Sequence, residues 1–461
     1  MECSNSHSVE SRTRTLDDVF ESFDPAEEGA QAYASIKTLY PICRSITGNG
    51  LRRSLHLLQE TIPLELHEVP SGTQVFDWTL PKEWNIRDAY IKNSAGTRVV
   101  DFRQSNLHVV NYSTPVRRKM SLVELEPHLH SLPEAPDWIP YRTSYYKETW
   151  GFCLSHRQHE SMKDGEYEVC IDSSLEAGHL TYGEYLIQGE TDNEVLISSH
   201  SCHPSLCNDN LSGMAVAAGL ARMLEDVALR YSYRFLWIPG TIGSITWLAR
   251  NEAILPRIKH GLVLSCVGDS GGFTYKRSRR GNADVDRAVE HVLRHSGQEF
   301  GVIDFVPYGY DERQYCSPGI NVPVGCFMRT PNARYPEYHT SADDLSLVSS
   351  APLGESLLQL LRVIQVVEGN NRYLNLNPKC EPQLGRRGLY RQMGGVKDAA
   401  VTEMAILWIL NLSDGRHDLL DIAVHSAIPF YQISQAADVL RNAGLLEAVR
   451  NDFKLNTNKT Q

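Results

Sequence analysis

The sequence predicts an α/β fold, a sheet flanked by helices, from three short apolar stretches at residues 195–197, 233–238 and 261–266. Such stretches are typical of buried strands, and the first two are followed by helical patterns at 214–224 and 242–249. Strands that alternate with helices indicate an α/β sheet. Because such sheets bind their ligands at the carboxyl ends of the strands, the loops after these strands are the expected place for chemistry.

Length and composition indicate a protein of more than one domain. A chain of 461 residues is long enough for two or three domains, and 42% apolar with 9% aromatic residues suffices for buried cores. The formal net charge of −11 argues against a surface coated with nucleic acid. No apolar run reaches the roughly 18 residues of a membrane span, and the N-terminal segment lacks the order of a signal peptide. We therefore expect a cytoplasmic protein with neither membrane nor nucleic-acid partner.

The N-terminal part leads into the main domain through two helical patterns. Residues 1 to about 25 are polar and are expected to be disordered. Helical patterns fill much of residues 30–58 and are broken at Pro41. Residues 65–70, ELHEVP, are typical of a strand. Arg44, in the turn between the two helical patterns, is a candidate to bind a substrate carboxylate, and a structural arginine is the alternative.

The next segment, residues 71–149, has a different character. It carries period-2 alternation and a Ser-Ala-Gly turn, which favour a small inserted β-rich domain. Its end contains Arg142, a second candidate for substrate binding. Five aromatic residues crowd this end: Trp138, Tyr141, Tyr145, Tyr146 and Trp150. They predict either a wall of the substrate cleft or a hydrophobic seam between domains.

The loop after residues 195–197 carries the strongest chemical signal. Within ten positions it contains His200, Cys202, His203, Cys207 and Asp209, and then Ser-Gly opens the helical pattern. An Asn-Asp-Asn cluster before a helix is also an ordinary capping sequence. Two imidazoles and a carboxylate in one short loop favour a metal site, and this ligand set suits zinc.

The spacing resembles the first two ligands of the co-catalytic zinc aminopeptidases, a superfamily that includes glutamate carboxypeptidases and glutaminyl cyclases. That resemblance implies that His200 binds one zinc ion and that Asp209 bridges two, with His203 as an alternative to His200. It also implies a further ligand in Asp269, after the third strand. His339, in a His-Thr pair followed by Asp343, matches the family's last ligand, and Asp343 is expected to support it.

A closer resemblance is to bacterial aminopeptidase-like proteins that carry an inserted domain of unknown function. It covers about residues 30–455 and rests on motifs such as ICRSITGNG, HPSLCNDNLSG, DERQYCSPG and EYHTSADDL. The resemblance implies a zinc-exopeptidase-like mixed sheet. Arg313, within the DERQYC motif, and Tyr310, just before it, are candidates for substrate binding. Tyr310 replaces a serine common in that family.

One departure from this family concerns catalysis. The family has Glu where this chain has Gly240, within the Pro-Gly-Thr-Ile-Gly-Ser stretch after residues 233–238. The glutamate of the family is a general base, and losing such a base typically slows a reaction by ~10²–10⁴. Glu312 and Glu337 are the nearest substitutes by motif, so they are the candidate catalytic residues.

The C-terminal part predicts a separate helical module. Three helical patterns occupy residues 399–450, and residues 386–455 resemble a winged-helix domain. The third pattern has Arg441 at its end but little other positive charge, which argues against DNA binding. An interaction or dimerisation module, compatible with a homo-oligomer, is the better interpretation.

These observations predict a zinc-dependent aminopeptidase-like hydrolase that acts on an amide or peptide bond of a small substrate. Two alternatives stay open: an amide-forming acyltransferase or cyclase on the same scaffold, and a binding protein that has lost the general base. The expected domains are a disordered N-terminus at 1–25, the zinc peptidase-like domain at 26–70 and 150–375, the insertion at 71–149 and the winged-helix-like domain at 386–455.

Overall fold

The computed structural model describes residues 14–389 and 399–449. It divides into two compact units, one built from the chain up to residue 286 with residues 298–360, the other from residues 287–297 and 361 onward. Among the described residues, no helix is both long and apolar enough to cross a membrane.

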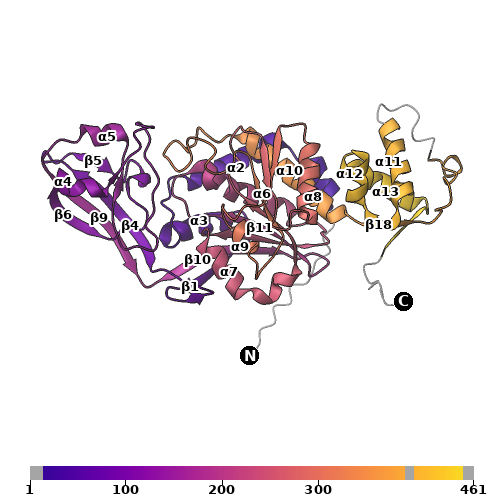
Figure 1. Cartoon of the computed structure of the whole chain (residues 1–461), viewed down its shortest axis with the longest axis horizontal. Coiled ribbons are helices and arrows are strands. Elements are labelled where there is room, and N and C mark those ends of the chain that lie inside the picture. Colours follow the sequence, from indigo (N-terminus) through magenta and orange to yellow (C-terminus); the bar gives the residue numbers. More distant parts are fainter. Residues whose placement is uncertain (1–13, 390–398, 450–461) are drawn as a thin grey trace. The chain divides into compact units, whose positions relative to one another are not determined.

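An eight-stranded mixed sheet forms the centre of the first unit (Figure 1). Its order is β1-β10-β12-β11-β13-β16-β14-β15, and β12, β11, β13 and β16 run parallel in its middle. The strands are β1 (Glu65–Pro70), β10 (His179–Ile187), β11 (Glu194–His200), β12 (Ser232–Ile238), β13 (Ile258–Leu264), β14 (Phe273–Lys276), β15 (Phe300–Ile303) and β16 (Val324–Met328). Every residue of β11 and β12 is buried, as expected for the middle strands of a covered sheet.

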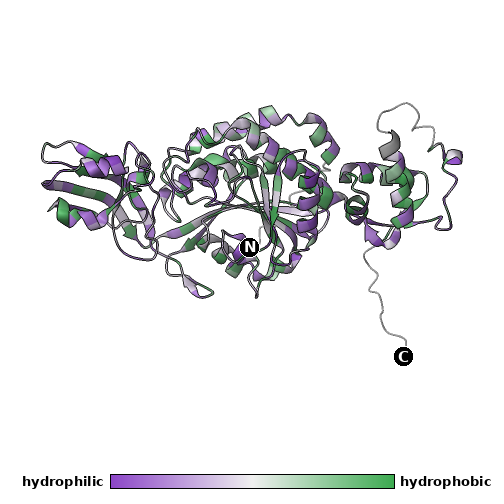
Figure 2. Cartoon of the chain, turned by 45° about the horizontal axis from the view of Figure 1, so that its top comes forward, coloured by the Kyte–Doolittle hydropathy of each residue, from purple (hydrophilic) through white to green (hydrophobic). Residues whose placement is uncertain are grey.

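Helices flank this sheet, so the predicted α/β fold is confirmed. They are α2 (Pro25–Leu39), α3 (Asn49–Gln59), α6 (Gly213–Leu224), α7 (Ile242–Arg250), α9 (Glu312–Tyr315) and the first part of α10 (Ser350–Gly369). Helix α8 (Asp284–Arg294) lies mostly in the second unit. Figure 2 shows hydrophilic and hydrophobic residues mixed on the outer helices, whereas α6 is buried along nearly its whole length. Helix α2 begins at Pro25 and ends before Pro41, and α6 and α7 lie where the helical patterns predicted them.

Helix α1 (Leu16–Ser22) occupies part of the N-terminal segment that was expected to be disordered. Thr15 and Asp18 form a reciprocal capping box at its start, and Val19 is buried. A cap and one buried contact therefore order a segment whose composition is mostly polar. The remainder of that prediction, residues 1–13, lies outside the described residues.

A four-stranded antiparallel sheet forms most of the inserted region. Its order is β5-β4-β9-β6, from β4 (Glu83–Lys92), β5 (Arg98–Asp101), β6 (Val116–Ser121) and β9 (Glu166–Glu176). Strand β9 lies beyond residue 149, so this sheet extends further along the chain than the expected boundary. Tyr167, Val169 and Ile171 alternate inward from β9, which gives the sheet its buried face.

Short elements complete the inserted region. They are the strand pairs β2 (Gln74–Val75) with β3 (Trp78–Thr79) and β7 (Leu129–His130) with β8 (Phe152–Cys153), and the helices α4 (Leu122–Leu125) and α5 (His156–Ser161).

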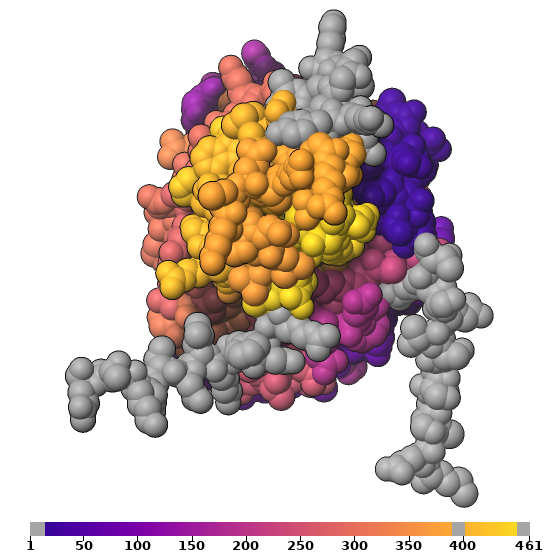
Figure 3. All heavy atoms as spheres, turned by 90° about the vertical axis from the view of Figure 1, so that its right-hand side faces the viewer, coloured from indigo at the N-terminus to yellow at the C-terminus, as the bar shows by residue number. Residues whose placement is uncertain are grey.

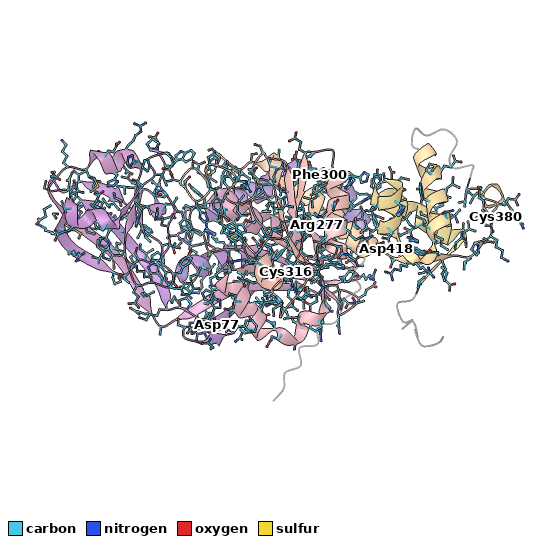
Figure 4. All side chains as sticks on the ribbon, viewed as in Figure 1. Asp77, Arg277, Phe300, Cys316, Cys380 and Asp418 are labelled. Carbon is cyan, nitrogen blue, oxygen red and sulfur yellow. The ribbon has the colours of Figure 1, made fainter. Side chains whose placement is uncertain are left out.

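The second unit contains the predicted winged helix, whose surface Figure 3 shows in orange and yellow. Three helices, α11 (Ala399–Leu412), α12 (Leu419–Ser426) and α13 (Phe430–Asn442), accompany a sheet of order β18-β17-β19. Its strands are β17 (Arg372–Asn375), β18 (Asp414–Asp418) and β19 (Leu446–Ala448). Asp418, labelled in Figure 4, caps α12 by accepting a hydrogen bond from the Asp421 amide.

Candidate metal centre and pocket

The candidate centre lies at the carboxyl end of β11, in a loop that is buried throughout. His200 is the last residue of β11, and residues 201–212 lead into α6 with every side chain buried. The Asn210 amide donates to Ser199 Oγ and to the Leu264 carbonyl, both at 3.0 Å. Asn210 thus ties the loop to the ends of both β11 and β13, a role beyond helix capping.

Three imidazoles converge on the Asp209 carboxylate. The His200 Nε2 lies 2.8 Å from Asp209 Oδ1, and the His339 Nε2 lies 3.0 Å from Asp209 Oδ2. The His203 Nε2 is 4.0 Å from the same Oδ2. One ligand atom each of His200, His203 and Asp209 lie within 4.8 Å of one another. The structure therefore brings together four of the five residues predicted as metal ligands.

This donor set fits a zinc ion. Zinc in proteins takes imidazole nitrogens and carboxylate oxygens in tetrahedral sites, and His200, His203 and Asp209 supply three such donors close together, with His339 beside Asp209 as a candidate for the fourth. Burial lowers the pKa of His203 well below 6.5, so its imidazole is neutral near pH 7, the form that binds metals. Burial also disfavours ionisation of Asp209, but the nearby histidines outweigh burial and hold the pKa of its carboxyl well below the usual range.

Tyrosine rings hold the histidines in place. Tyr310 stacks on His200 with ring centroids 4.0 Å apart, and Tyr338 stacks on His339 at 3.9 Å. The Tyr310 hydroxyl donates to Asp209 Oδ2 at 2.6 Å. Burial and the Asp209 charge raise the pKa of Tyr310 well above 10, so this hydroxyl stays protonated and acts as a hydrogen-bond donor.

Asp269 lies apart from the converging ligand atoms. Its carboxylate accepts hydrogen bonds from Thr330 Oγ1 at 2.6 Å, from the Gly271 amide at 2.7 Å and from Asn208 Nδ2 at 2.9 Å. Since Asn208 precedes Asp209, Asp269 supports the loop in this structure. A donor role toward a metal stays a prediction for Asp269.

The Asp343 side chain supports the same loop by binding backbone amides of that loop. It was expected to assist His339, but its carboxylate accepts from the amides of Asn208 at 2.6 Å and Asp209 at 3.0 Å. Burial raises the pKa of Asp343 to about 7. The acid thus positions Asp209 rather than bonding to the imidazole of His339.

The neighbouring strand β12 ends at Ile238 and is followed by Pro239 and Gly240, neither of which carries a carboxylate. A Cβ placed on Gly240 would lie 3.1 Å from the His200 Cβ and 3.5 Å from Asp311 Oδ2. Asp311 is fully buried and accepts from Ser244 Oγ at 2.7 Å, while its Oδ2 has no hydrogen-bond partner among the described residues. Burial raises the pKa of Asp311 to about 6. The motif-based prediction passed over this acid in favour of Glu312.

The two glutamates predicted as catalytic residues occupy different surroundings. Glu312 is buried and accepts from Lys276 Nζ at 2.8 Å and from the Tyr310 amide at 3.1 Å. Glu337 is half-buried, and its carbonyl accepts from the Thr340 amide at 3.0 Å. Neither glutamate is among the residues that line the pocket described below.

Of the two arginines proposed from the N-terminal half, Arg44 has a structural setting. Its Nε donates to the His203 carbonyl at 2.9 Å and its Nη1 to the Leu39 carbonyl at 2.6 Å, in full burial. Arg44 therefore supports the backbone of the candidate ligand His203. Arg142 is exposed and does not line the pocket.

A pocket of about 300 Å³ opens beside the cluster. The candidate ligands His203 and His339 line it together with Tyr310 and Arg313. The rest of its lining is Ile46, Trp78, Tyr141, Thr143, Tyr145, Tyr146, Cys202, Gly240, Thr241, Ile242, Ile245 and Gly309. Three of the crowded aromatic residues thus form a cleft wall, while Trp150 stacks on His128 in the inserted region at 3.6 Å. The cleft-wall interpretation therefore fits Tyr141, Tyr145 and Tyr146, whereas the seam between domains stays a prediction.

Comparisons with known proteins agree with this fold. Residues 33–370 match a domain of unknown function, DUF4910, and residues 371–448 match a winged helix-turn-helix. A Clostridium acetobutylicum protein named "Putative polysaccharide biosynthesis protein with aminopeptidase-like domain" is 54% identical over 424 residues, 92% of this chain and 98% of its own. The crystal structure of a "putative peptidase" from the same species has a TM-score of 0.90 at 51% identity, covering 94% of this chain and 100% of that one.

A more distant likeness is to a zinc aminopeptidase from Bacillus subtilis. Its structure has a TM-score of 0.54 at 12% identity and covers 74% of this chain and 94% of the Bacillus chain. At this identity the likeness shows the fold alone.

Proposed function

Because this chain belongs to the DUF4910 family, with a winged helix-turn-helix after it, we propose that it is a zinc-dependent hydrolase of an amide or peptide bond in a small substrate. One observation carries the proposal: three imidazoles and the Asp209 carboxylate converge beside a pocket whose lining includes His203 and His339. A surface cluster without a pocket would suit a structural metal better.

Each residue of the cluster has a part in this proposal. His200, His203, Asp209 and His339 would hold the metal. Zinc, when bound, supplies a Lewis acid for the amide carbonyl. Tyr310 lines the pocket with a protonated hydroxyl, and because its one proton is donated to Asp209 Oδ2 it would hold that carboxylate in place beside the metal. The tyrosine stacking on His200 and His339 keeps both rings oriented.

A second candidate function is ligand binding without turnover, and the end of β12 favours it. Hydrolysis needs a group that accepts a proton at the reacting centre, and Gly240 supplies none. Glu312, one of the two substitutes, is already paired with Lys276 in the interior. A site with this pattern binds an amide and turns it over slowly or not at all.

Metal content and amide turnover separate the two candidates. We expect purified protein to contain about one zinc ion per chain, since the four donors make one tetrahedral site. The zinc-loaded protein should release product from a panel of amino-acid amides, dipeptides and N-acyl amino acids, and a chelator should abolish the release. Zinc binding without any turnover would replace hydrolysis with the binding function, and failure to bind zinc would contradict both.

For the C-terminal module we propose protein contacts rather than DNA binding. The last turn of α13 offers Arg441 as its basic residue, and this arginine lies 3.4 Å from the Asp438 carboxylate. We also propose a cytoplasmic location, because the nine cysteines that the structure describes are free thiols, as in a reducing compartment. Salt-sensitive, micromolar binding of a duplex DNA by the full chain would contradict the first of these proposals.

A further inference from the structure

Arg313 is a charged side chain in the pocket lining that has no acid partner. It lies on α9 and is half-buried, and its Nε is shielded from solvent without a hydrogen-bond acceptor. Within residues 14–389 and 399–449, no carboxylate forms an ion pair with it. A guanidinium that is partly desolvated and unpaired is costly, because burial removes water from a charge that nothing else compensates.

The acids next to Arg313 in the sequence are engaged elsewhere. Glu312 forms a buried ion pair with Lys276 at 2.8 Å. Asp311 is fully buried, so it does not reach the pocket, and its Oδ1 accepts from Ser244. Arg313 lowers the pKa of Asp311 less than His200 and the Ser244 hydroxyl do. Screening Asp311 therefore does not account for the position of Arg313 in the pocket lining.

The rest of the pocket lining indicates what kind of ligand would bind beside Arg313. Ile46, Ile242 and Ile245 supply apolar contacts, and Trp78 and Tyr146 lie with ring centroids 5.3 Å apart. Trp78 and Tyr146 are 43% and 56% exposed, which is unusual for large aromatic side chains and suits a surface that a ligand covers. The pocket thus offers metal-ligand histidines, an apolar and aromatic wall, and one unpaired guanidinium.

We propose that Arg313 recognises a carboxylate and that the pocket takes small amides that carry one, of the N-acyl amino acid class. This inference rests on the proposed function, because it places the amide toward His203 and His339 and the acid group at Arg313. A guanidinium binds a carboxylate through two parallel hydrogen bonds, which gives both affinity and orientation. An apolar or aromatic side chain of the ligand would lie against the aromatic wall.

Binding of a matched pair of compounds tests the inference without requiring turnover. N-acetylphenylalanine and N-acetylphenylalaninamide differ in the carboxylate alone, and isothermal titration calorimetry on the zinc-loaded full chain measures both. We expect the carboxylate compound to bind about tenfold more tightly, the effect of one good charged hydrogen-bonding interaction. Phenyl phosphate, a second anion with an aromatic ring, should bind more weakly than N-acetylphenylalanine.

Three variants assign the preference to Arg313. Arg313→Gln should remove the preference, and Arg313→Lys should retain only part of it, because lysine keeps the charge but lacks the planar fork. Arg257→Gln makes the same change of charge at an exposed arginine outside the pocket lining and should retain the full preference. Zinc content and thermal midpoint are measured for every variant, so that a folding defect is recognised. If Arg313→Gln does not fold, Arg313→Lys tests the inference.

Several outcomes would overturn the inference. They are equal binding of the two compounds to the parent, no binding of N-acetylphenylalanine at millimolar concentration, tighter binding of phenyl phosphate, or an unchanged preference in Arg313→Gln. A preference that depends on Arg313, in a protein that hydrolyses no amide, would instead retain the recognition and reject the hydrolase. Hydrolysis of amides with equal affinity for neutral and acidic ones would support the hydrolase and reject the recognition of a carboxylate by Arg313.

Discussion

The ends of β11 and β12 are neighbours in the same sheet, yet they differ in their chemistry. The two strands run parallel, and His200 pairs with Ile238 in the register between them. Beyond His200 the chain supplies a dense set of donor atoms, and beyond Ile238 it supplies Pro239 and Gly240. The comparison teaches that one strand end of this sheet can carry a cluster of candidate metal ligands while the neighbouring strand end carries no carboxylate.

The two strand ends also differ in the hydrogen bonds that hold the residues around them. On the β11 side, Arg44, Asn210 and Asp343 each hold the loop through hydrogen bonds to its backbone or to the strands beside it. On the β12 side, the carboxylate nearest the Gly240 position is Asp311, whose Oδ2 has no partner among the described residues. The β11 end is held by several hydrogen bonds, whereas the Gly240 position lies beside a buried acid that has one oxygen without a partner among the described residues.

The largest effect that we expect concerns the β11 end. Asp209→Asn keeps the size of the side chain but removes the charge on which the three imidazoles converge. Zinc affinity should fall by at least ~10²-fold, in the range seen when metal-site interactions are lost, as measured by competition with a chelator and by elemental analysis. Asp192→Asn, at an exposed aspartate before β11, is the control and should bind zinc as the parent does. An unchanged zinc affinity in Asp209→Asn would remove the β11 end from the metal site.

The next effect concerns the β12 end. Gly240→Glu restores a proton acceptor and should raise amide hydrolysis by ~10² or more, the usual contribution of a general base. Gly240→Gln is the matched control, because its Cβ meets the same contact 3.1 Å from the His200 Cβ but its amide accepts no proton. Equal rates in the two variants, both folded and loaded with zinc, would show that the missing glutamate does not limit hydrolysis.

The smallest effect concerns the acid behind Gly240. Burial raises the pKa of Asp311 from its ordinary value near 3.8 to about 6, so the folded state binds a proton there more tightly than the unfolded state. Its contribution to stability is therefore present at low pH and is lost as the pH rises through 6. Relative to Asp311→Asn, the parent should lose about 2 kcal/mol of unfolding free energy between pH 4.5 and 7.5.

Urea unfolding at both pH values measures this difference. Asp77→Asn, at an exposed aspartate that Figure 4 labels, serves as the control and should follow the parent. A parent that gains stability over the same interval relative to Asp311→Asn would show that Asp311 is paired in the folded protein.

Much of the fold was predictable because its signals are local. The apolar runs of β11, β12 and β13 and the helices after two of them depend on nearby residues. The pairing of β9 was not predictable in this way, because its partner β4 lies about 80 residues earlier in the chain. Alternation identifies a strand but does not identify the strands beside it. A capped helix such as α1 was missed because composition outweighed the local Thr-x-x-Asp pattern.

The candidate site divides in the same way. His200, His203 and Asp209 share one loop, so their proximity followed from the sequence, and the resemblance supplied His339. The hydrogen bond between Tyr310 and Asp209 joins residues 101 positions apart, and the ion pair of Glu312, in helix α9, depends on Lys276 in strand β14. Such contacts are set by the folded sheet, which is why residue type alone suggested Glu312 as a base and left Asp311 aside.

Anomalous X-ray diffraction at the zinc edge, from crystals of the zinc-loaded protein, tests the central claim most directly. The account predicts one strong peak about 2.0–2.2 Å from the Nε2 atoms of His200, His203 and His339 and from an Asp209 oxygen, with no metal beside Gly240. A peak bound by Asp269 instead, a second metal between Asp209 and the end of β12, or no peak at this cluster would contradict it.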